Sequence, residues 1–496
     1  MKELTNLALD TAQMRGATYA DVRIVEQREQ AIAVKDGVVE VLSETIDRGF
    51  GVRVIAEGAW GFASSALLSK QEVERVAALA VEIARASALV QREAVDIGPA
   101  VVSRGAYHTP IEIDPFDVSV ESKIELLLEA DDAMRRVDGV KVRRGNLVCL
   151  RERKTFANTE GAFTEQEIVE TGGGIVALAV DEGEVQQRSY PNSFGRDQRT
   201  VGWEYIQEID LPGHAERIAS EAVALLTADP CPSAVTTVVL GPTQLALQIH
   251  ESCGHPTELD RVFGTEAAYA GTSFLTPDQL NALRYGSPVV NLTADATLPG
   301  GLGTFGWDDE GVPAQRVELV REGLFVGYLT SRETAIQLAR LQGWENVPLR
   351  SSGAMRASGW NRIPLIRMTN VSIEPGEWSF EDLIAATEDG IYMETNRSWS
   401  IDDKRLNFQF GTEIGYQIKG GKLGRMLKNC TYTGVTPQFW GSCDAVCNRD
   451  HWQVWGTPNC GKGQPSQIAH TGHGAAPARF RNVRVGVMSN AKERMG

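Results

Sequence analysis

The sequence T-T-V-V-L-G-P-T-Q-L-A-L-Q-I-H-E-S-C-G-H-P-T-E-L-D, residues 236–260, joins a predicted strand to a predicted helix in the second half of the chain. Its first five residues, 236–240, form a short apolar and β-branched run that is typical of a strand. Pro242 follows after one glycine and stands near the start of a helical run, where proline is favoured. The helix would carry the chain directly into a motif rich in chemically reactive side chains.

That motif contains two histidines, His250 and His255, with Glu251 directly after the first. Two neutral imidazoles can hold a divalent metal such as Zn²⁺, and an adjacent carboxylate can take a proton from metal-bound water. Such an arrangement hydrolyses amide bonds. The common zinc-protease motif, however, places its histidines four residues apart rather than five.

The five-residue spacing has a geometric consequence. On a regular helix, residues four apart lie roughly 40° from alignment, whereas residues five apart lie about 140° apart. His250 and His255 therefore cannot ligate one ion from an undistorted helix. Gly254 permits unusual backbone angles, and Pro256 disfavours helical angles at the residue before it. We expect the helix to break or to widen by a π-type turn before His255. The alternative is a capped helix end with two polar histidines and no metal.

The composition places the chain among ordinary globular proteins. It has 496 residues, 42% of them hydrophobic and 23% charged, with a formal net charge of -16. This acidity argues against a nucleic-acid-binding protein, which would usually show a basic face. No run of about 18 apolar residues predicts a transmembrane helix. The first ten residues do not resemble a secretory signal, and seven cysteines do not make a disulfide scaffold, so we expect reduced thiols and a cytoplasmic location.

The pattern along the chain predicts an α+β fold with two domains. The first, residues 1–228, is expected to be an α/β domain in which helices flank hairpins, and the second, 229–496, a mainly antiparallel β-sheet that carries the metal-motif helix. Two prolines at 230 and 232 mark the boundary. Helices are predicted over 3–15, 69–84, 118–136 and 205–228, hairpin turns at 36–37, 57–58, 160–161, 172–174, 322–323 and 419–421, and a linker over 86–115.

The residues alone leave the third metal ligand open. Catalytic zinc usually has three protein ligands, and a thiolate binds it tightly. Cys460 is favoured over Cys149 and Cys231 because glycine and proline surround it in an irregular loop. The other candidates are Glu258, close to His255; the acidic cluster Asp308, Asp309 and Glu310, which more often caps a turn; Cys443, Cys447 and His451, which could form a separate structural zinc site; and Cys253, most simply a small buried residue.

Two further histidines, His470 and His473, lie near the end of the sequence. They could orient a substrate. Their position so close to the end of the chain favours solvated side chains instead.

Several stretches together resemble one family. Residues 250–260 match the pattern H-E-x-x-G-H-x-x-E-x-D, which is the signature of the metal-bearing members of the TldD/PmbA family. The stretches that fit the same family run from near the start of the chain to near its end, namely 51–54, 60–63, 308–311, 367–370, 390–392 and 459–462. The resemblance therefore covers most of the chain.

The resemblance implies a site and an activity. His250, His255 and Cys460 would be the ligands of one metal ion per chain, and Glu251 would be the general base. The metal would be Zn²⁺, although imidazole and thiolate ligands also suit iron or cobalt. The activity implied is that of a TldD-like metallopeptidase that hydrolyses unfolded or extended peptides.

The resemblance also implies partners, and it leaves alternatives. A PmbA/TldE-like paralogue without the metal motif would be the heterodimer partner, although a homodimer is also compatible with the sequence; no nucleic acid and no membrane are expected as partners. An extended peptide could add as a strand to an exposed sheet edge. The alternatives are a metal-dependent hydrolase of a non-peptide amide and a non-catalytic subunit with a structural metal.

Overall fold

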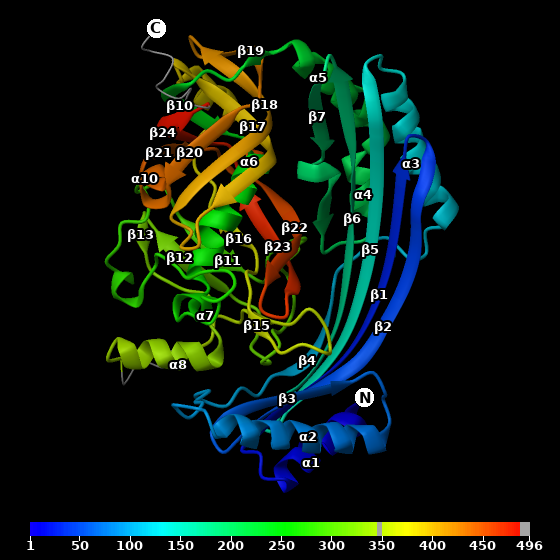
Figure 1. Cartoon of the computed structure of the whole chain (residues 1–496), viewed down its shortest axis with the longest axis vertical. Helices are drawn as coiled ribbons and strands as arrows, with labels where there is room; N and C mark the ends of the chain where they lie inside the picture. The colour runs from blue at the N-terminus through cyan, green and yellow to red at the C-terminus, as the bar shows by residue number, and fades with distance from the viewer. Residues whose placement is uncertain (345–349, 487–496) are drawn as a thin grey trace.

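The structure is a computed structural model that describes residues 1–344 and 350–486 (Figure 1). The N-terminal part builds one eight-stranded sheet in the order β3-β2-β1-β5-β6-β4, with β7 and β8 both paired to β6. All pairings are antiparallel except that of β4 with β6. The strands are β1 (Tyr19–Lys35), β2 (Val38–Ala56), β3 (Ala59–Ser65), β4 (Arg104–His108), β5 (Val140–Asn158), β6 (Phe163–Asp181), β7 (Glu184–Tyr190) and β8 (Asp197–Arg199).

Helices cover this sheet at its two ends, as Figure 1 shows. At one end, α1 and α2 pack on β1, β2 and β3 around a small alanine- and valine-rich core. At the other end, α3, α4 and α5 pack on β5 and β6 around a second core. Ser69 caps α2 by accepting a hydrogen bond from the Glu72 N–H, as the sequence predicts. The helices are α1 (Lys2–Met14), α2 (Lys70–Ala88), α3 (Val120–Arg135), α4 (Glu204–Ile209) and α5 (Leu211–Thr227).

The C-terminal part is built on a ring of strands. β17, β10, β24, β20 and β18 pair in that order, and β18 pairs back to β17, so that the ring closes. β19, β9 and β21 extend it, and β13-β12-β11-β16, β14-β15 and β22-β23 form smaller sheets beside it. The strands are β9 (Asp229–Pro230), β10 (Ala234–Leu240), β11 (Leu292–Asp295), β12 (Arg316–Arg321), β13 (Leu324–Phe325), β14 (Met355–Arg356), β15 (Leu365–Ile366), β16 (Val371–Ile373), β17 (Asp389–Ile401), β18 (Asn407–Lys419), β19 (Lys422–Lys428), β20 (Thr431–Val435), β21 (Cys443–Val446), β22 (Gln453–Lys462), β23 (Gln467–Ala475) and β24 (Ala478–Val485).

The helices of this part are short and lie around the ring. One of them, α6, follows β10 and leads into the motif. The others connect strands or pack on the outside of the smaller sheets (Figure 1). They are α6 (Pro242–Ile249), α7 (Leu259–Val262), α8 (Arg332–Leu341), α9 (Phe380–Ala385) and α10 (Thr436–Gly441).

These elements confirm the predicted α+β class and most of the predicted hairpins. The turn expected at 172–174 is wrong, because those glycines lie inside β6. The helix expected over 205–228 is broken at Asp210, which has a left-handed φ of 40°. The linker expected over 86–115 contains β4. The chain passes from the first sheet to the second between α5 and β9. The division into two domains after residue 228 stays a prediction. In the described ranges, no helix is long and apolar enough to cross a membrane.

Buried ion pairs join the two parts. Glu413 on β18, with none of its surface exposed, accepts hydrogen bonds from the Ser189 N–H at 2.7 Å and from Arg188 Nη1 at 3.2 Å, both on β7. Burial raises the pKa of Glu413 even though Arg188 opposes the shift. Asp309 makes a second such contact, since Arg23 on β1 and Lys154 on β5 both pair with it. The relative position of the two parts therefore depends on compensated charges rather than on apolar contact alone.

We predict that Arg188→Met lowers the free energy of unfolding by about 3–5 kcal/mol, because it leaves the Glu413 carboxyl buried without its cation. Urea unfolding measures the effect. The matched control is Arg217→Met. Arg217 is exposed and pairs with Glu221, which also pairs with Arg188, so its loss should lower the free energy of unfolding by at most about 1 kcal/mol. Adding Glu413→Gln to Arg188→Met should recover part of the loss. Equal effects of the two single variants would contradict this account.

Candidate metal centre

The metal motif begins in a regular helix and then widens. After α6, residues His250–Gly254 form a π-helix, and His255–Thr257 continue as a 3-10 turn. The backbone N–H of His255 donates to the carbonyl of His250, a five-residue step. The extra residue brings the two imidazoles to the same side, with ring centroids 4.9 Å apart and planes at 89°. The expected π-type turn is therefore confirmed.

Gly254 closes this turn because there is no room for a side chain. A Cβ at this position would lie 1.9 Å from the Met368 sulfur atom. Glycine thus lets the widened turn pack directly on the stretch that precedes β16. The requirement is close approach rather than an unusual backbone angle, since Gly254 has a φ of -71°.

Cys460 reaches the motif from the hairpin of β22 and β23. Its Sγ lies 3.6 Å from His255 Nε2, and the donor atoms of His250, His255 and Cys460 all lie within 4.8 Å of one another. Within the described residues, this is the one group of three or more histidine, cysteine or acidic side chains that converges in this way. Two imidazoles and one thiolate are a donor set that zinc and related transition metals accept, so these residues fit such an ion.

Charged contacts hold the hairpin against the motif. Lys462, two residues after Cys460, donates to Asp260 Oδ1 and to the Ile366 carbonyl, both at 2.7 Å. Arg367 donates to the carbonyl of Cys460 itself. The end of the motif and the loop before β16 therefore fix where the thiol lies.

A chain of hydrogen bonds fixes the tautomer of His250. His473 Nδ1 lies 3.0 Å from the Val371 carbonyl, which can only accept, so this nitrogen carries the proton. Burial holds the pKa of His473 well below its ordinary value, so the ring is neutral and its Nε2 is an acceptor. That Nε2 lies 2.7 Å from His250 Nδ1, which therefore donates. The lone pair of His250 Nε2 is left for a metal.

A similar contact acts on His255. Its Nδ1 lies 3.0 Å from Glu258 Oε2. Burial opposes ionisation of Glu258, but Lys462 and His255 outweigh it and hold the pKa of this carboxyl well below its usual range. Glu258 is therefore a carboxylate that orients the imidazole of His255, and it is not among the converging donors themselves.

The electrostatics of the donors favour metal binding. Burial lowers the pKa of His250 to about 4, which keeps its imidazole neutral. Burial alone would raise the pKa of the Cys460 thiol, but His255 and Arg367 outweigh it, and the pKa is lowered. A neutral imidazole and an easily ionised thiol are the forms that coordinate a cation.

Glu251 stands beside the donors and is held by an arginine. Its carboxylate forms an ion pair with Arg405, which lies in the turn between β17 and β18 with a left-handed φ of 64°. Burial opposes the charge of Glu251, yet His255 and Arg405 outweigh it and lower its pKa. Glu251 is thus an ionised carboxylate next to the candidate ligands.

The donors face a cavity of about 280 Å³. Glu251 and Arg405 line it together with the donor side chains, and the residues of β22 from Gly456 to Gly461 form one wall. Phe194 and Arg196, which follow β7, come from the first sheet. The site therefore opens toward a space at the junction of the two parts, unlike a closed four-ligand site.

The remaining sequence candidates lie elsewhere. Asp308 caps a turn by accepting from the Glu310 and Val312 N–H groups, and Asp309 and Glu310 pair with cations of the first sheet. Cys253 is buried, as expected, and accepts a hydrogen bond from the Tyr285 hydroxyl. The separate zinc site proposed for Cys443, Cys447 and His451 does not form among the described residues, where His451 Nε2 accepts from the Phe380 N–H instead.

The expectation of solvated histidines near the end of the chain is wrong. His473 has no exposed surface, and His470 pairs with Glu170. Both lie on β23, whose alternation places Ala469, Thr471 and His473 on the buried face. That alternation was the available signal for His473, whereas no sequence signal pointed to Arg405.

Comparisons with known proteins identify the family of the chain. Three family descriptions match the chain: "PmbA/TldA metallopeptidase domain 1" over residues 20–84, the "central domain" over 113–226 and the "C-terminal domain" over 233–486. A metalloprotease of Methanocaldococcus jannaschii is 30% identical over 86% of this chain and 89% of its own length. A zinc metalloprotease TldD homolog of Saccharolobus solfataricus is 21% identical over 86% of this chain and 88% of its own.

A solved structure has the same fold. TldE from Thermococcus kodakarensis superimposes with a TM-score of 0.72 and 16% identity, covering 98% of this chain and 100% of that one. The family match over 233–486 spans more than half of the sequence and includes all three converging donors. The chain belongs to the PmbA/TldD family of metallopeptidases.

Proposed function

We propose that this chain is a metallopeptidase subunit that hydrolyses unfolded or extended peptides with one zinc ion, or another divalent transition metal, held by His250, His255 and Cys460. The observation that carries the proposal is the convergence of these donors beside an ionised Glu251 on the wall of a cavity. The Saccharolobus solfataricus relative is named a zinc metalloprotease, which supports zinc.

The bound metal would polarise the scissile carbonyl and make a water molecule more acidic. Glu251 would accept the proton of that water and deliver it to the leaving amine. Arg405 holds the Glu251 carboxylate in position, and His473 and Glu258 orient the two imidazoles. The thiol of Cys460 is fixed by the contacts of the hairpin with Arg367 and Lys462.

A peptide would reach the site as an extended chain alongside β22. This strand pairs with β23 in a two-stranded sheet, and its residues from Gly456 to Gly461 line the cavity. Main-chain hydrogen bonds to such an edge favour unfolded substrates and depend little on side chains. Sheet edges in folded proteins are already paired or covered, so we infer that folded proteins are poor substrates.

The partner and the compartment are part of the same proposal. The likeness in fold to TldE supports pairing with a metal-free paralogue of that type, and a homodimer is the second possibility. All seven cysteines have free thiols, which suits a reducing compartment such as the cytoplasm.

Glu251→Gln should lower kcat for an unstructured peptide by about 10²–10⁴-fold, because the amide cannot accept the proton. The bound metal should remain, since Glu251 is not among the donors. Mass spectrometry of the products and elemental analysis of the protein measure the two effects. Turnover by the variant at the unaltered rate would contradict the assignment. Absence of cleavage by the metal-loaded protein, with and without its paralogue, would favour a non-peptide amide as substrate or a structural metal.

His473→Phe should weaken metal binding by about 10–100-fold, because His250 loses the acceptor that orients its ring. Competition with a chromophoric chelator measures the affinity. His470→Gln is the matched control, since His470 lies on the same strand but pairs with Glu170, and its metal affinity should be unaltered. Unaltered affinity in His473→Phe would show that the contact with His250 plays no part in metal binding.

Peptides with N-methyl groups at alternate positions around the scissile bond should be cleaved at least about tenfold more slowly than the unmodified sequence. Each N-methyl group removes a donor worth about 0.5–1.5 kcal/mol in net terms. The comparison uses kcat/KM from product quantification. Peptides methylated far from the scissile bond serve as controls. Equal cleavage of both sets would exclude strand addition along β22.

A further inference from the structure

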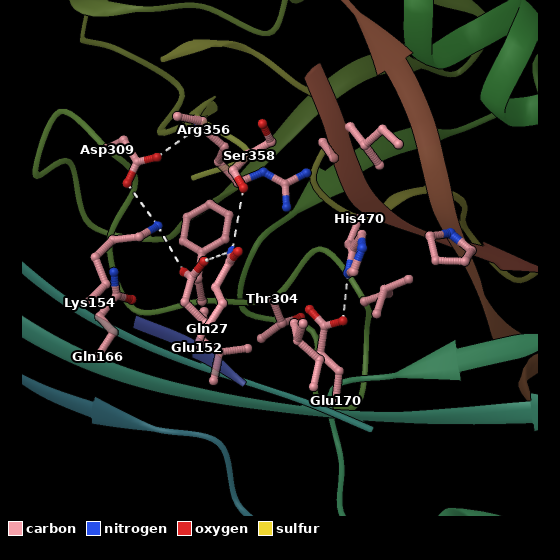
Figure 2. A pocket seen from close by; sticks show the side chains of 18 of the residues that line it. Gln27, Glu152, Lys154, Gln166, Glu170, Thr304, Asp309, Arg356, Ser358 and His470 are labelled. Atoms are coloured by element: carbon pink, nitrogen blue, oxygen red, sulfur yellow. Dashed lines mark hydrogen bonds and ion pairs between the residues drawn. The ribbon is translucent and has the colours of Figure 1, made fainter. Parts of the chain in front are cut away.

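A second cavity, of about 380 Å³, lies between the first sheet and the hairpin that carries Cys460 (Figure 2). Its floor is made by β1, β5 and β6, and Ile468 and His470 of β23 contribute to the opposite side. Pro458 of β22 lines both this cavity and the metal cavity, so the two spaces meet at that strand. The volume is within the range of small-molecule pockets.

Most charges in this cavity are compensated by neighbours. Lys154 lies 2.9 Å from Asp309 and 3.0 Å from Glu152. At the other end, His470 Nδ1 lies 2.6 Å from Glu170 Oε2. Figure 2 shows these two groups on opposite sides of the view, with Arg356 and Ser358 between them.

Two charged side chains of the lining form no ion pair among the described residues, namely the exposed Glu29 and the cation Arg356. The Nη2 of Arg356 donates to the Met368 carbonyl and its guanidinium lies 5.6 Å from the centre of the Phe305 ring, but it forms no ion pair with any carboxylate of the described residues. Its Nε is buried and has no hydrogen-bond partner there.

Burial, together with the nearby Arg367, lowers the pKa of Arg356 to about 10, which still leaves it charged at neutral pH. Asp309 and Glu170 oppose this shift without forming an ion pair with Arg356. Arg356 is a partly exposed guanidinium on the wall of the cavity, where it can form a direct ion pair with a bound anion.

His470 supplies a second donor. Because its Nδ1 faces the Glu170 carboxylate, that nitrogen carries a proton. Burial lowers the pKa of His470, but the charge of Glu170 outweighs this and raises it. The Nε2 atom has no hydrogen-bond partner among the described residues, so a protonated ring offers a free N–H on the wall of the cavity.

The other side chains of the cavity select the kind of anion. Four carboxylates also line it and would repel a doubly charged phosphate more strongly than a singly charged anion, namely Glu29, Glu152, Glu170 and Asp309. A carboxylate carries one charge and matches the planar guanidinium. Phe305 and Trp307 add apolar surface beside Arg356. A carboxylate and an apolar group on one residue are found together at the C-terminus of a peptide.

We propose that this cavity binds the C-terminal residue of the peptide, with Arg356 and His470 donating hydrogen bonds to its α-carboxylate. The inference rests on the proposed function in one respect, namely that the ligand is a peptide. Such a site would make the chain selective for peptides whose C-terminus lies beyond the metal site along β22.

The test is binding rather than turnover. A short peptide ending in leucine, labelled at its N-terminus, is titrated with full-length, metal-loaded Glu251→Gln protein and followed by fluorescence anisotropy. The free acid should bind about tenfold to a hundredfold more tightly than the C-terminal amide, as expected for hydrogen bonds to a charged group. A peptide that ends in glutamate and has a C-terminal amide should bind with the same affinity as the leucine amide, although its last side chain carries a carboxylate. Equal affinities of acid and leucine amide, or acid-like affinity of the glutamate amide, would overturn the proposal.

Variants assign the selectivity to this cavity. Arg356→Gln should bring the ratio of acid to amide affinity close to one, while Arg362→Gln, which removes a nearby arginine that does not line the cavity, should retain it. If circular dichroism shows that Arg356→Gln is misfolded, His470→Gln takes its place and should lower the ratio. An unaltered ratio in folded Arg356→Gln would overturn the proposal.

Cleavage by the unsubstituted protein is measured separately, so that the peptidase activity and the carboxylate site are tested independently. Selectivity for the acid without cleavage would refute the peptidase and retain the carboxylate site. Cleavage without selectivity would refute the carboxylate site and retain the peptidase.

Discussion

The hydrogen bond from the His255 N–H to the His250 carbonyl is the contact on which the candidate site depends. It spans one residue more than a regular helical turn and so rotates His255 to the side of His250. A regular turn would place the two imidazoles nearly on opposite faces. Gly254 allows the wider turn because its Cα packs against Met368 without a side chain between them. Every later feature, from the third donor to the cavity, is arranged around this pair of rings.

The rest of the site comes from distant parts of the chain. Cys460 and His473 lie 200 or more residues after the motif, on the two strands of one hairpin, and the backbone carbonyl that orients His473 belongs to β16. Arg405 reaches Glu251 from a turn of the strand ring. Because these contacts are long-range, the donor set exists only when the C-terminal part is folded. Buried pairs such as Arg188 with Glu413 then place the first sheet over the same cavity.

Local patterns in the sequence predicted much of this arrangement, and the reason is physical. The turns at 36–37, 57–58, 322–323 and 419–421 and the widened helix at Gly254 are decided by neighbours in sequence. The triple glycine at 172–174 gave a wrong prediction of a turn, because these glycines let neighbouring backbone pack closely against β6. A Cβ on Gly174 would lie 2.3 Å from the carbonyl oxygen of Gly195. His473 and Arg405 acquire their roles through tertiary contacts alone. Cys460 was one of several possible third ligands until the family resemblance singled it out, and its convergence with His250 and His255 is a property of the folded chain.

X-ray absorption spectroscopy at the zinc edge of the loaded protein tests the central claim most directly. The account predicts one sulfur donor at about 2.3 Å and the remaining donors as nitrogen or oxygen at about 2.0–2.2 Å. Cys460→Ser should remove the sulfur contribution, whereas Cys253→Ser, which changes the cysteine nearest to the motif histidines in sequence, should leave it. A spectrum without sulfur, or one with two sulfur donors, would contradict the assignment of His250, His255 and Cys460 as the metal ligands.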